Sequence, residues 1–224
     1  MFIPSIIREA YLVHLLSTDL KDKTVIIFAL KPKTCELIRL LLREMDLRST
    51  ALHSQMSQSD RIGSLAKFKS GIVSILVCTD VGSRYCLIAS FFKLSSIYRG
   101  LDIPTVQVVI NYQLPADPAD YVHRIGRTAR AGRDGQSISL VTERDVDLVH
   151  AIESKTGKQM TEYTVNENHV LEILDTVSIS KRVAGMEMYE KGFGKKEQIR
   201  KEKKAFIASH KEEKRVKKKS LNKK

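Results

Sequence analysis

The stretch KTVIIFALKPKTCELIRLLLREM, residues 23–45, joins a short apolar run to an amphipathic helical pattern. The run at 23–30 has the length and the β-branched content of a strand that is buried on both faces. The apolar positions that follow share one helical face, and they are Leu37, Ile38, Leu41, Leu42 and Met45. A buried strand followed by a covering helix is the repeating unit of a parallel sheet.

The same alternation continues along the chain. Further strands are predicted at 49–53, 74–80, 105–114 and 136–142. Further helices are predicted at 57–68, from residue 117 onward, and at 143–154; the first of these has Ile62, Leu65 and Phe68 facing inward. The pattern predicts an α/β fold, a mostly parallel sheet with helices on both faces.

In a sheet of this kind ligands bind beyond the carboxyl ends of the strands. The predicted strands end at Leu52-His53, at Thr79-Asp80 and at Asn111-Tyr112. We therefore expect these positions to lie along one functional edge of the sheet.

The positive charge is concentrated at one end of the chain. Residues 181–224 hold 17 of the 38 Lys and Arg and 6 of the 26 Asp and Glu, a net charge of +11 out of +12. A helical extension with a stripe of Val170, Leu171, Leu174 and Val177 is predicted at about 166–191. We expect a remnant of an upstream or interdomain segment at 1–9, a domain at 10–164, this extension at 165–192, and a basic tail at 193–224 that is helical or disordered.

Other features argue against a secreted or membrane protein. Cys35, Cys78 and Cys86 form no CxxC pair, so we expect free thiols in a reducing compartment and no metal site. The apolar start contains Arg8 and Glu9, which does not fit a signal peptide. The run CLIASFF at 86–92 is too short to span a bilayer.

The strongest chemical signal is DPADYVHRIGRTARAGRDG, residues 117–135. Asp117-Pro118 with Asp120 is typical of a helix start. A continuous helix would place His123, Arg127 and Arg130 on one face, and no acid falls between Tyr121 and Arg133. Guanidinium groups bind phosphate oxygens through paired hydrogen bonds, so a polyphosphate is the expected partner, although most charge runs are simply solvated surface.

This segment resembles motif VI of the DEAD-box RNA helicases, and three other stretches agree with it in order. VIIFALKPKTCE resembles motif IV, LHSQMSQSDRIGSLAKFKSG resembles the motif IVa region, and ILVCTDVGS with RGLDIP resembles motif V. The match covers about residues 10–160 and is most similar to the nucleolar helicase 49 type of this family. It implies a RecA-like domain, the C-terminal half of an ATP-dependent RNA helicase that acts in rRNA processing and ribosome biogenesis in the nucleolus.

The resemblance also implies roles for individual residues. Arg127 and Arg130 would be arginine fingers for the γ-phosphate of ATP. Asp102, Arg99, Gly100 and His123 would serve the nucleotide and the junction with the N-terminal RecA-like half. Residues that would contact the RNA backbone, without sequence specificity, are Thr79, Gln58, Arg61 and Arg124. ATP and Mg would be held mainly by the N-terminal half, and the chain would be monomeric. The family's His-Gly in motif IVa is His53-Ser54 here.

Two departures from the family pattern bear on activity. The sequence contains no GxxxxGK[ST] and no Asp-Glu-Ala-Asp box, so we expect no ATP hydrolysis by this chain alone. Motif V is split, because removing residues 84–98, or equally 85–99, leaves an uninterrupted TDVGSRGLDIP. Loop closure over the added residues is cheap, but a misplacement of about 1 Å can cost roughly 10²-fold in rate. We therefore expect the insert to damage the site, rather than to bulge outward harmlessly.

Three functions remain open at the level of sequence. The leading hypothesis is a helicase half that needs its partner half. The second is an ATP-independent RNA-binding or regulatory fragment that uses its basic tail. The third is a splice or truncation product without a function of its own.

Overall fold

The computed structural model describes residues 1–80, 106–128 and 134–194. Several predictions from sequence lie outside these residues: the insert at 84–98, the basic tail beyond residue 194, and the roles of Arg99, Gly100, Asp102 and Arg130. Two compact units are present, Met1–Met186 and Glu187–Lys224. The fold and the site described below belong to the first unit.

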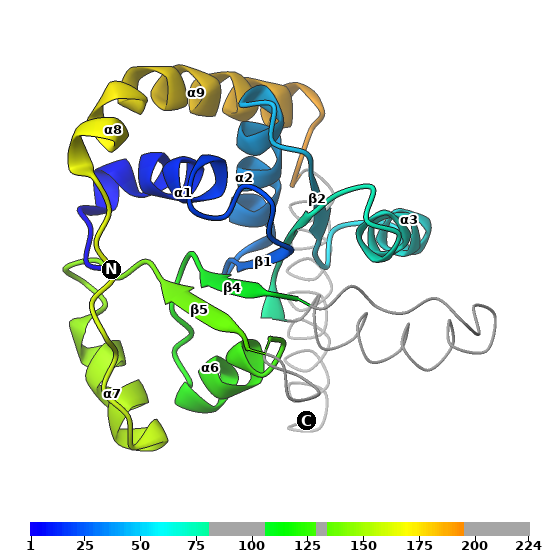
Figure 1. Cartoon of the computed structure of the whole chain (residues 1–224). Helices are drawn as coiled ribbons and strands as arrows, with labels where there is room; N and C mark the ends of the chain where they lie inside the picture. Colours follow the sequence, from blue (N-terminus) through cyan, green and yellow to red (C-terminus); the bar gives the residue numbers. More distant parts are fainter. Residues whose placement is uncertain (81–105, 129–133, 195–224) are drawn as a thin grey trace, which may run out of the picture. The chain divides into compact units, whose positions relative to one another are not determined.

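A single five-stranded parallel sheet forms the centre of this unit (Figure 1). Its spatial order is β2-β3-β1-β4-β5, and all four pairings are parallel. The strands are β1 (Val25–Phe28), β2 (Ser49–Leu52), β3 (Ile75–Cys78), β4 (Val108–Asn111) and β5 (Gln136–Ser139). All five predicted strands are confirmed. β1, β3 and β4 are buried at every position, as expected for strands of a parallel sheet that helices cover on both faces.

The helices cover the sheet from both sides. Those of the first unit are η1 (Ser5–Ile7), α1 (Arg8–Ser17), α2 (Pro32–Glu44), α3 (Gln58–Lys69), α6 (Pro118–Ile125), α7 (Val146–Thr156), α8 (Glu167–Glu172) and α9 (Leu174–Glu190, which runs past its end). In Figure 1, α1, α2, α8 and α9 lie on one side of the sheet, and α6 and α7 lie on the other. The prediction of an α/β fold with two helical layers is confirmed.

Alternation of side chains along the strands divides the core between the two faces. Val25 and Ile27 of β1 pack in the cluster that contains α1, α2 and the start of α9. Ile26 and Phe28 point the other way, into the cluster that contains Leu65 of α3. The central strands β1, β3 and β4 are therefore covered on both faces, and the polar residues described below follow the strand ends.

The first nine residues pack against the domain that follows them. Phe2 forms a parallel bridge with Val141, and Ile3 is fully buried. Arg8 begins α1 and donates to the carbonyl of Tyr112 at 3.1 Å, with its guanidinium 5.3 Å from the Tyr112 ring. This segment, which the sequence predicted to be a remnant of an upstream or interdomain segment, packs in the same compact unit as the residues that follow it.

Two details of the predicted helices at 57–68 and 143–154 are wrong. Ile62 was expected to face inward, but it is 41% exposed, and α3 buries only Leu65 and Phe68 of that set. The helix after β5 begins at Val146 rather than at 143, because the Asp145 carboxylate accepts from both the backbone and the hydroxyl of Thr142 and holds a turn there.

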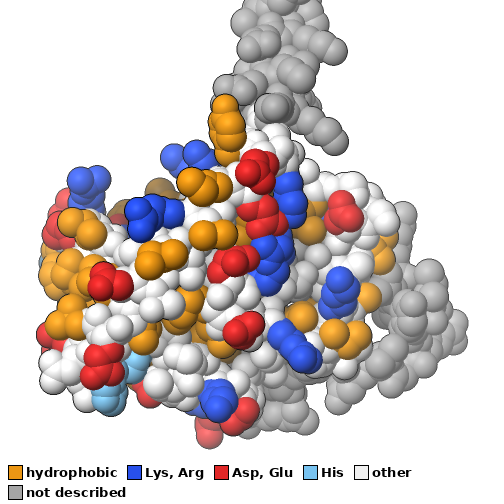
Figure 2. Space-filling model, turned by 90° about the horizontal axis from the view of Figure 1, so that it is seen from above, with side chains coloured by type: hydrophobic (Ala, Val, Ile, Leu, Met, Phe, Trp, Pro, Cys, Tyr) orange, Lys and Arg blue, Asp and Glu red, His pale blue; other side chains and the backbone are white. Residues whose placement is uncertain are grey.

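The predicted single helix at 166–191 is two helices that meet at Ile173. Val170 and Val177 reach the core, whereas Leu171 is 57% exposed. On α9, Ile179, Val183 and Met186 also remain exposed. Figure 2 shows hydrophobic side chains scattered among charged ones on the face seen from above. None of the described helices is long and apolar enough to cross a membrane.

Candidate functional site

The carboxyl ends of the strands meet along one edge of the sheet, as the sequence predicted. Leu52 and Phe28 both stand opposite Cys78, and Phe28 also stands opposite Asn111, so the strands end level with one another. The backbone N–H of Thr79 donates to the carbonyl of Leu52 at 3.2 Å. The residues that follow β2, β3 and β4 are therefore brought together from segments far apart in the sequence.

An ion pair between Asp80 and Arg124 lies at this edge. The guanidinium donates from Nε to Oδ1 and from Nη2 to Oδ2, each at 2.6 Å, which is the paired geometry that Arg and a carboxylate favour. The Arg124 side chain is 1% exposed and that of Asp80 is 22% exposed. This pair joins α6 to the chain that leaves β3.

The same guanidinium also contacts β4 and β1. Its Nη1 donates to the Asn111 Oδ1 at 3.2 Å and to the Gln113 carbonyl at 2.7 Å. The guanidinium carbon lies 5.1 Å from the centre of the Phe28 ring, a cation–π contact. Arg124 was predicted to contact RNA, but a side chain this buried and this fully paired has no surface to offer a phosphate. Its observed role is to hold strand ends and α6 together.

The start of α6 forms as predicted. Asp117 caps the helix by accepting from the backbone N–H of Ala119 at 2.8 Å, Pro118 is the first helical residue, and Asp120 lies in the first turn. His123 is on the exposed side, with 64% of its side chain accessible.

The end of α6 differs from the prediction. The helix stops at Ile125, and Gly126 follows, where a Cβ would lie only 3.3 Å from the carbonyl oxygen of Val122. Thr128 is buried and donates its hydroxyl to the carbonyl of Val106 at 2.7 Å, which anchors the segment beyond the helix. Arg127 therefore does not share a helix face with His123; its Nε instead donates to the His123 carbonyl at 3.2 Å.

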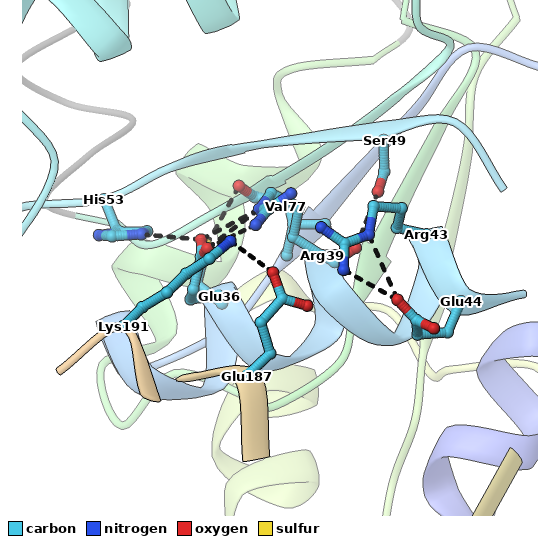
Figure 3. Close-up of polar contacts among 10 residues, drawn as sticks. Glu36, Arg39, Arg43, Glu44, Ser49, His53, Val77, Glu187 and Lys191 are labelled. Atoms are coloured by element: carbon cyan, nitrogen blue, oxygen red, sulfur yellow. Dashed lines mark hydrogen bonds and ion pairs between the residues drawn. The ribbon is translucent and has the colours of Figure 1, made fainter. Parts of the chain in front are cut away.

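A second polar cluster lies where β2 ends (Figure 3). The Glu36 carboxylate of α2 accepts from Arg39, with the shortest contact at 2.6 Å, and its Oε2 lies 3.4 Å from the His53 Nε2. Burial would raise the pKa of Glu36, but the hydrogen bonds from His53 and Arg39 outweigh it and lower the pKa to about 2. Glu36 is therefore held as a carboxylate against the end of β2.

The segment after His53 leads into α3. Ser57 caps α3 by accepting from the backbone N–H of Asp60 at 3.1 Å, and Gln58 is exposed in its first turn. The Arg61 Nη2 donates to the Ser54 carbonyl at 2.7 Å. Among the described residues only Asp46 has a positive φ without being glycine, so the conformation at Ser54 does not require the glycine that the family carries there.

The two described cysteines, Cys35 and Cys78, are buried free thiols. Burial raises the pKa of Cys35 and of Cys78, and the positive charges of Arg124 and Arg127 only partly oppose this at Cys78. Both thiols therefore stay protonated at neutral pH. The described part of the chain holds no cluster of three His, Cys, Asp or Glu that could bind a metal ion.

The structure thus sorts the predicted site residues into two groups. Thr79, Gln58 and Arg61 lie around the ends of β2 and β3 and the start of α3, while His123 and Arg127 lie on and after α6. Sequence reasoning missed the roles of Glu36, Asn111 and Thr128. An acid among the buried positions of α2 was a visible signal for Glu36, whereas the polar partners of Asn111 and Thr128 come from distant segments.

These features define a class, the C-terminal RecA-like domain of a DEAD-box RNA helicase. The profile of the helicase conserved C-terminal domain family matches residues 8–132, and the chain belongs to that family. The ATP-dependent RNA helicase dbp8 of Schizosaccharomyces pombe is 52% identical over 205 residues, which are 91% of this chain and 42% of that protein. The probable ATP-dependent RNA helicase DDX49 of Mus musculus is 43% identical over 210 residues, 92% of this chain and 41% of that protein. The chain spans about two fifths of the length of these relatives.

Solved structures agree with this assignment. The E. coli DEAD-box protein SrmB is 32% identical with a TM-score of 0.62, and the alignment covers 74% of this chain and 89% of that one. Domain 2 of the DEAD-box helicase Mss116p, bound to an RNA duplex, is 25% identical with a TM-score of 0.60, covering 85% of this chain and 77% of that one. The prediction of a RecA-like fold is confirmed.

Replacing Asp80 by Asn should strongly destabilise the domain. Arg124 would keep its charge in a site where it is 1% exposed, and such an unmatched charge costs roughly 3–5 kcal/mol. Urea unfolding measures the loss. Glu44→Gln is the matched control, because Glu44 pairs with Arg43 at 2.8 Å on the surface and should change the free energy of unfolding by about 1 kcal/mol or less. Equal effects of the two variants would contradict a structural role for the buried pair.

The low pKa of Glu36 predicts a specific acid sensitivity. Since the pKa falls from 4.5 to about 2 on folding, the stabilisation is complete above pH 4.5 and is lost as the pH falls toward 2. Glu36→Gln should therefore be less stable than the original chain at pH 7, by on the order of 2 kcal/mol. This difference should shrink on acidification, as measured by urea unfolding at pH 7, 5, 4 and 3. If the difference in free energy of unfolding stays constant over this range, ionisation of Glu36 contributes nothing to stability.

Proposed function

We propose that the chain acts as the second half of an ATP-dependent RNA helicase and works only together with an N-terminal RecA-like half. The observation that carries the proposal is the shared strand edge. It gathers the motif IVa and motif V residues His53 and Thr79 and, through the Asp80–Arg124 pair, the motif VI helix. The edge thus carries two sets of predicted site residues, one near the start of α3 and one on and after α6. A domain that contributes to both an RNA site and a nucleotide site needs two such sets.

The RNA contacts would come from the group at the start of α3 and the end of β3. Gln58 is exposed and Arg61 is partly exposed, and both lie in the first turns of a helix whose N-terminal end favours anions. Thr79, which the sequence predicted to join them, is 3% exposed at the end of β3 and offers a phosphate no more surface than Arg124 does. Gln58 and Arg61 would touch phosphate and sugar, which gives affinity without sequence specificity. Neutralised phosphates make such binding steeply dependent on salt.

The nucleotide contacts would come from the motif VI side. Arg127 and Arg130 would approach the γ-phosphate of ATP, His123 would support the cleft, and Arg99, Gly100 and Asp102 would reach the nucleotide from motif V. The exposed position of His123 fits a surface that meets another domain. ATP with its Mg would be held mainly by the N-terminal half. ATP would supply the phosphoryl group for hydrolysis. The part of this chain is to place guanidinium groups where negative charge develops.

We further propose that the chain works in rRNA processing and ribosome biogenesis in the nucleus and nucleolus. The similarity to the dbp8 and DDX49 helicases along nine tenths of this chain supports that setting. The net charge of +11 on residues 181–224 supports a second candidate, ATP-independent binding of RNA through the tail. The test is RNA binding by this chain in the absence of the N-terminal half. Binding that is lost when residues 181–224 are deleted would favour this second function.

Arg127→Ala should abolish turnover in a reconstituted enzyme. A separately produced N-terminal half of a DEAD-box helicase is mixed with this chain, and RNA-stimulated ATP hydrolysis is measured. Loss of an arginine finger costs roughly 10³–10⁵ in rate. Arg144→Ala is the control, because Arg144 is exposed before α7 and outside both groups. A variant with Arg127 replaced that hydrolyses ATP at the unchanged rate would refute this role.

The insert in motif V can be tested in the same assay. Deletion of residues 84–98 restores TDVGSRGLDIP and should raise turnover by roughly 10²-fold, because catalytic groups tolerate little misplacement. Equal turnover with and without these residues would mean that the insert leaves both ends of motif V in register.

A further inference from the structure

His53 connects α2 to the segment that enters α3. Its side chain is 2% exposed and has a polar partner on each side of the ring. The Nε2 lies 3.4 Å from the Glu36 Oε2, and the Nδ1 lies 3.3 Å from the backbone nitrogen of Gln55. Figure 3 shows His53 pointing toward Glu36 on α2.

These two contacts determine which ring nitrogen carries the proton. The backbone N–H of Gln55 can only donate, so the Nδ1 of His53 must accept. The Nε2 then carries the hydrogen and donates it to the Glu36 carboxylate, so the neutral ring satisfies both neighbours. Glu36 is itself oriented by Arg39, which contacts both of its oxygens at 2.6–3.1 Å. A fixed carboxylate therefore fixes the plane of the ring, and the ring holds the Gln55 amide.

The contacts continue into the residues expected to bind RNA. The His53 carbonyl accepts from the backbone N–H of Met56 at 3.3 Å, and the Ser54 carbonyl accepts from the Arg61 Nη2 at 2.7 Å. The direction of the Arg61 side chain thus depends on where the backbone at Ser54 lies. The Arg61 Nε has no partner within the described ranges, so this carbonyl is the contact that orients the guanidinium.

We propose that Glu36 and His53 are positioning residues for the RNA contact, holding residues 54–61 so that Arg61 and Gln58 meet a phosphate in a preformed geometry. This inference rests on the proposed function. A buried His and a mostly buried carboxylate are costly to place in a core, and packing alone could be met by apolar residues. Their directed contacts to a backbone amide match the support that a binding site needs in order to be rigid.

The first test measures the segment itself, without RNA. Hydrogen exchange of the full chain should report on peptides covering 53–61 in His53→Ala and Glu36→Ala. We expect exchange there to rise at least about tenfold, while the strand β3 keeps its protection. Glu44→Ala, on the same helix, is the matched control and should leave 53–61 unchanged. Unchanged exchange in both test variants would overturn the proposal.

The second test measures how ATP hydrolysis by the reconstituted enzyme depends on the concentration of a single-stranded RNA. Arg61→Ala, Glu36→Ala and His53→Ala should each raise the RNA concentration for half-maximal ATP hydrolysis, by about three- to twentyfold, with kcat little changed. The double variant of His53→Ala with Arg61→Ala should lose less than the sum of the two single losses, since His53 acts in part through the contact that Arg61 makes. Glu36→Gln should recover most of the loss, because an amide oxygen still accepts from His53.

The outcomes separate this inference from the function on which it rests. If Arg61→Ala leaves the RNA dependence unchanged, the proposed RNA contact fails. If Arg61→Ala weakens RNA binding but His53→Ala and Glu36→Ala do not, the RNA contact of Arg61 stands and the positioning role of His53 and Glu36 fails. Additive losses in the double variant would also overturn it, since they would show that His53 acts on another part of the protein.

Discussion

The buried guanidinium of Arg124 is the point through which several parts of the domain are fixed relative to one another. It pairs with Asp80 after β3, donates to Asn111 and Gln113 at the end of β4, and lies over Phe28 of β1. An arginine with 1% exposure must have every donor group satisfied, so each partner is held in place by the same requirement. The motif VI helix is thereby held against the strand ends. Any shift of this helix would expose the Arg124 charge or leave it buried without a partner.

Around this pair the domain divides its work between a rigid interior and a polar edge. The central strands are covered on both faces by two apolar clusters, and the polar groups of the site stand where the strands end. The two polar groups on this edge use different supports. The α6 side depends on Arg124 and Thr128, whereas the α3 side depends on the hydrogen bonds that run from Arg39 through Glu36 and His53 to the backbone of Gln55. Two independently braced groups suit a domain that would meet RNA with one and a nucleotide with the other.

The main errors of the sequence reading share one cause. Arg127 was placed on a helix face with His123 because the pattern continues at helical spacing, but α6 ends at Ile125, where Gly126 packs closely and Thr128 bonds to the start of β4. Arg124 looked like one more cation in a basic row, yet it is the buried one. Ile62 and Leu171 match an apolar stripe, yet they are 41% and 57% exposed. In each case the deciding partner comes from a distant segment, which spacing along one helix does not reveal.

The sequence by itself determined the parallel sheet, its five strands, the edge at which they end, and the family, because periodicity and ordered motifs are local or collinear properties. It also determined that the chain lacks a P-loop and that its positive charge lies in residues 181–224. Only the tertiary structure decided which of the charged residues are buried and paired. Asp80 meets Arg124 across 44 positions and Glu36 meets His53 across 17, and the strength of each contact depends on a burial that only the folded sheet creates.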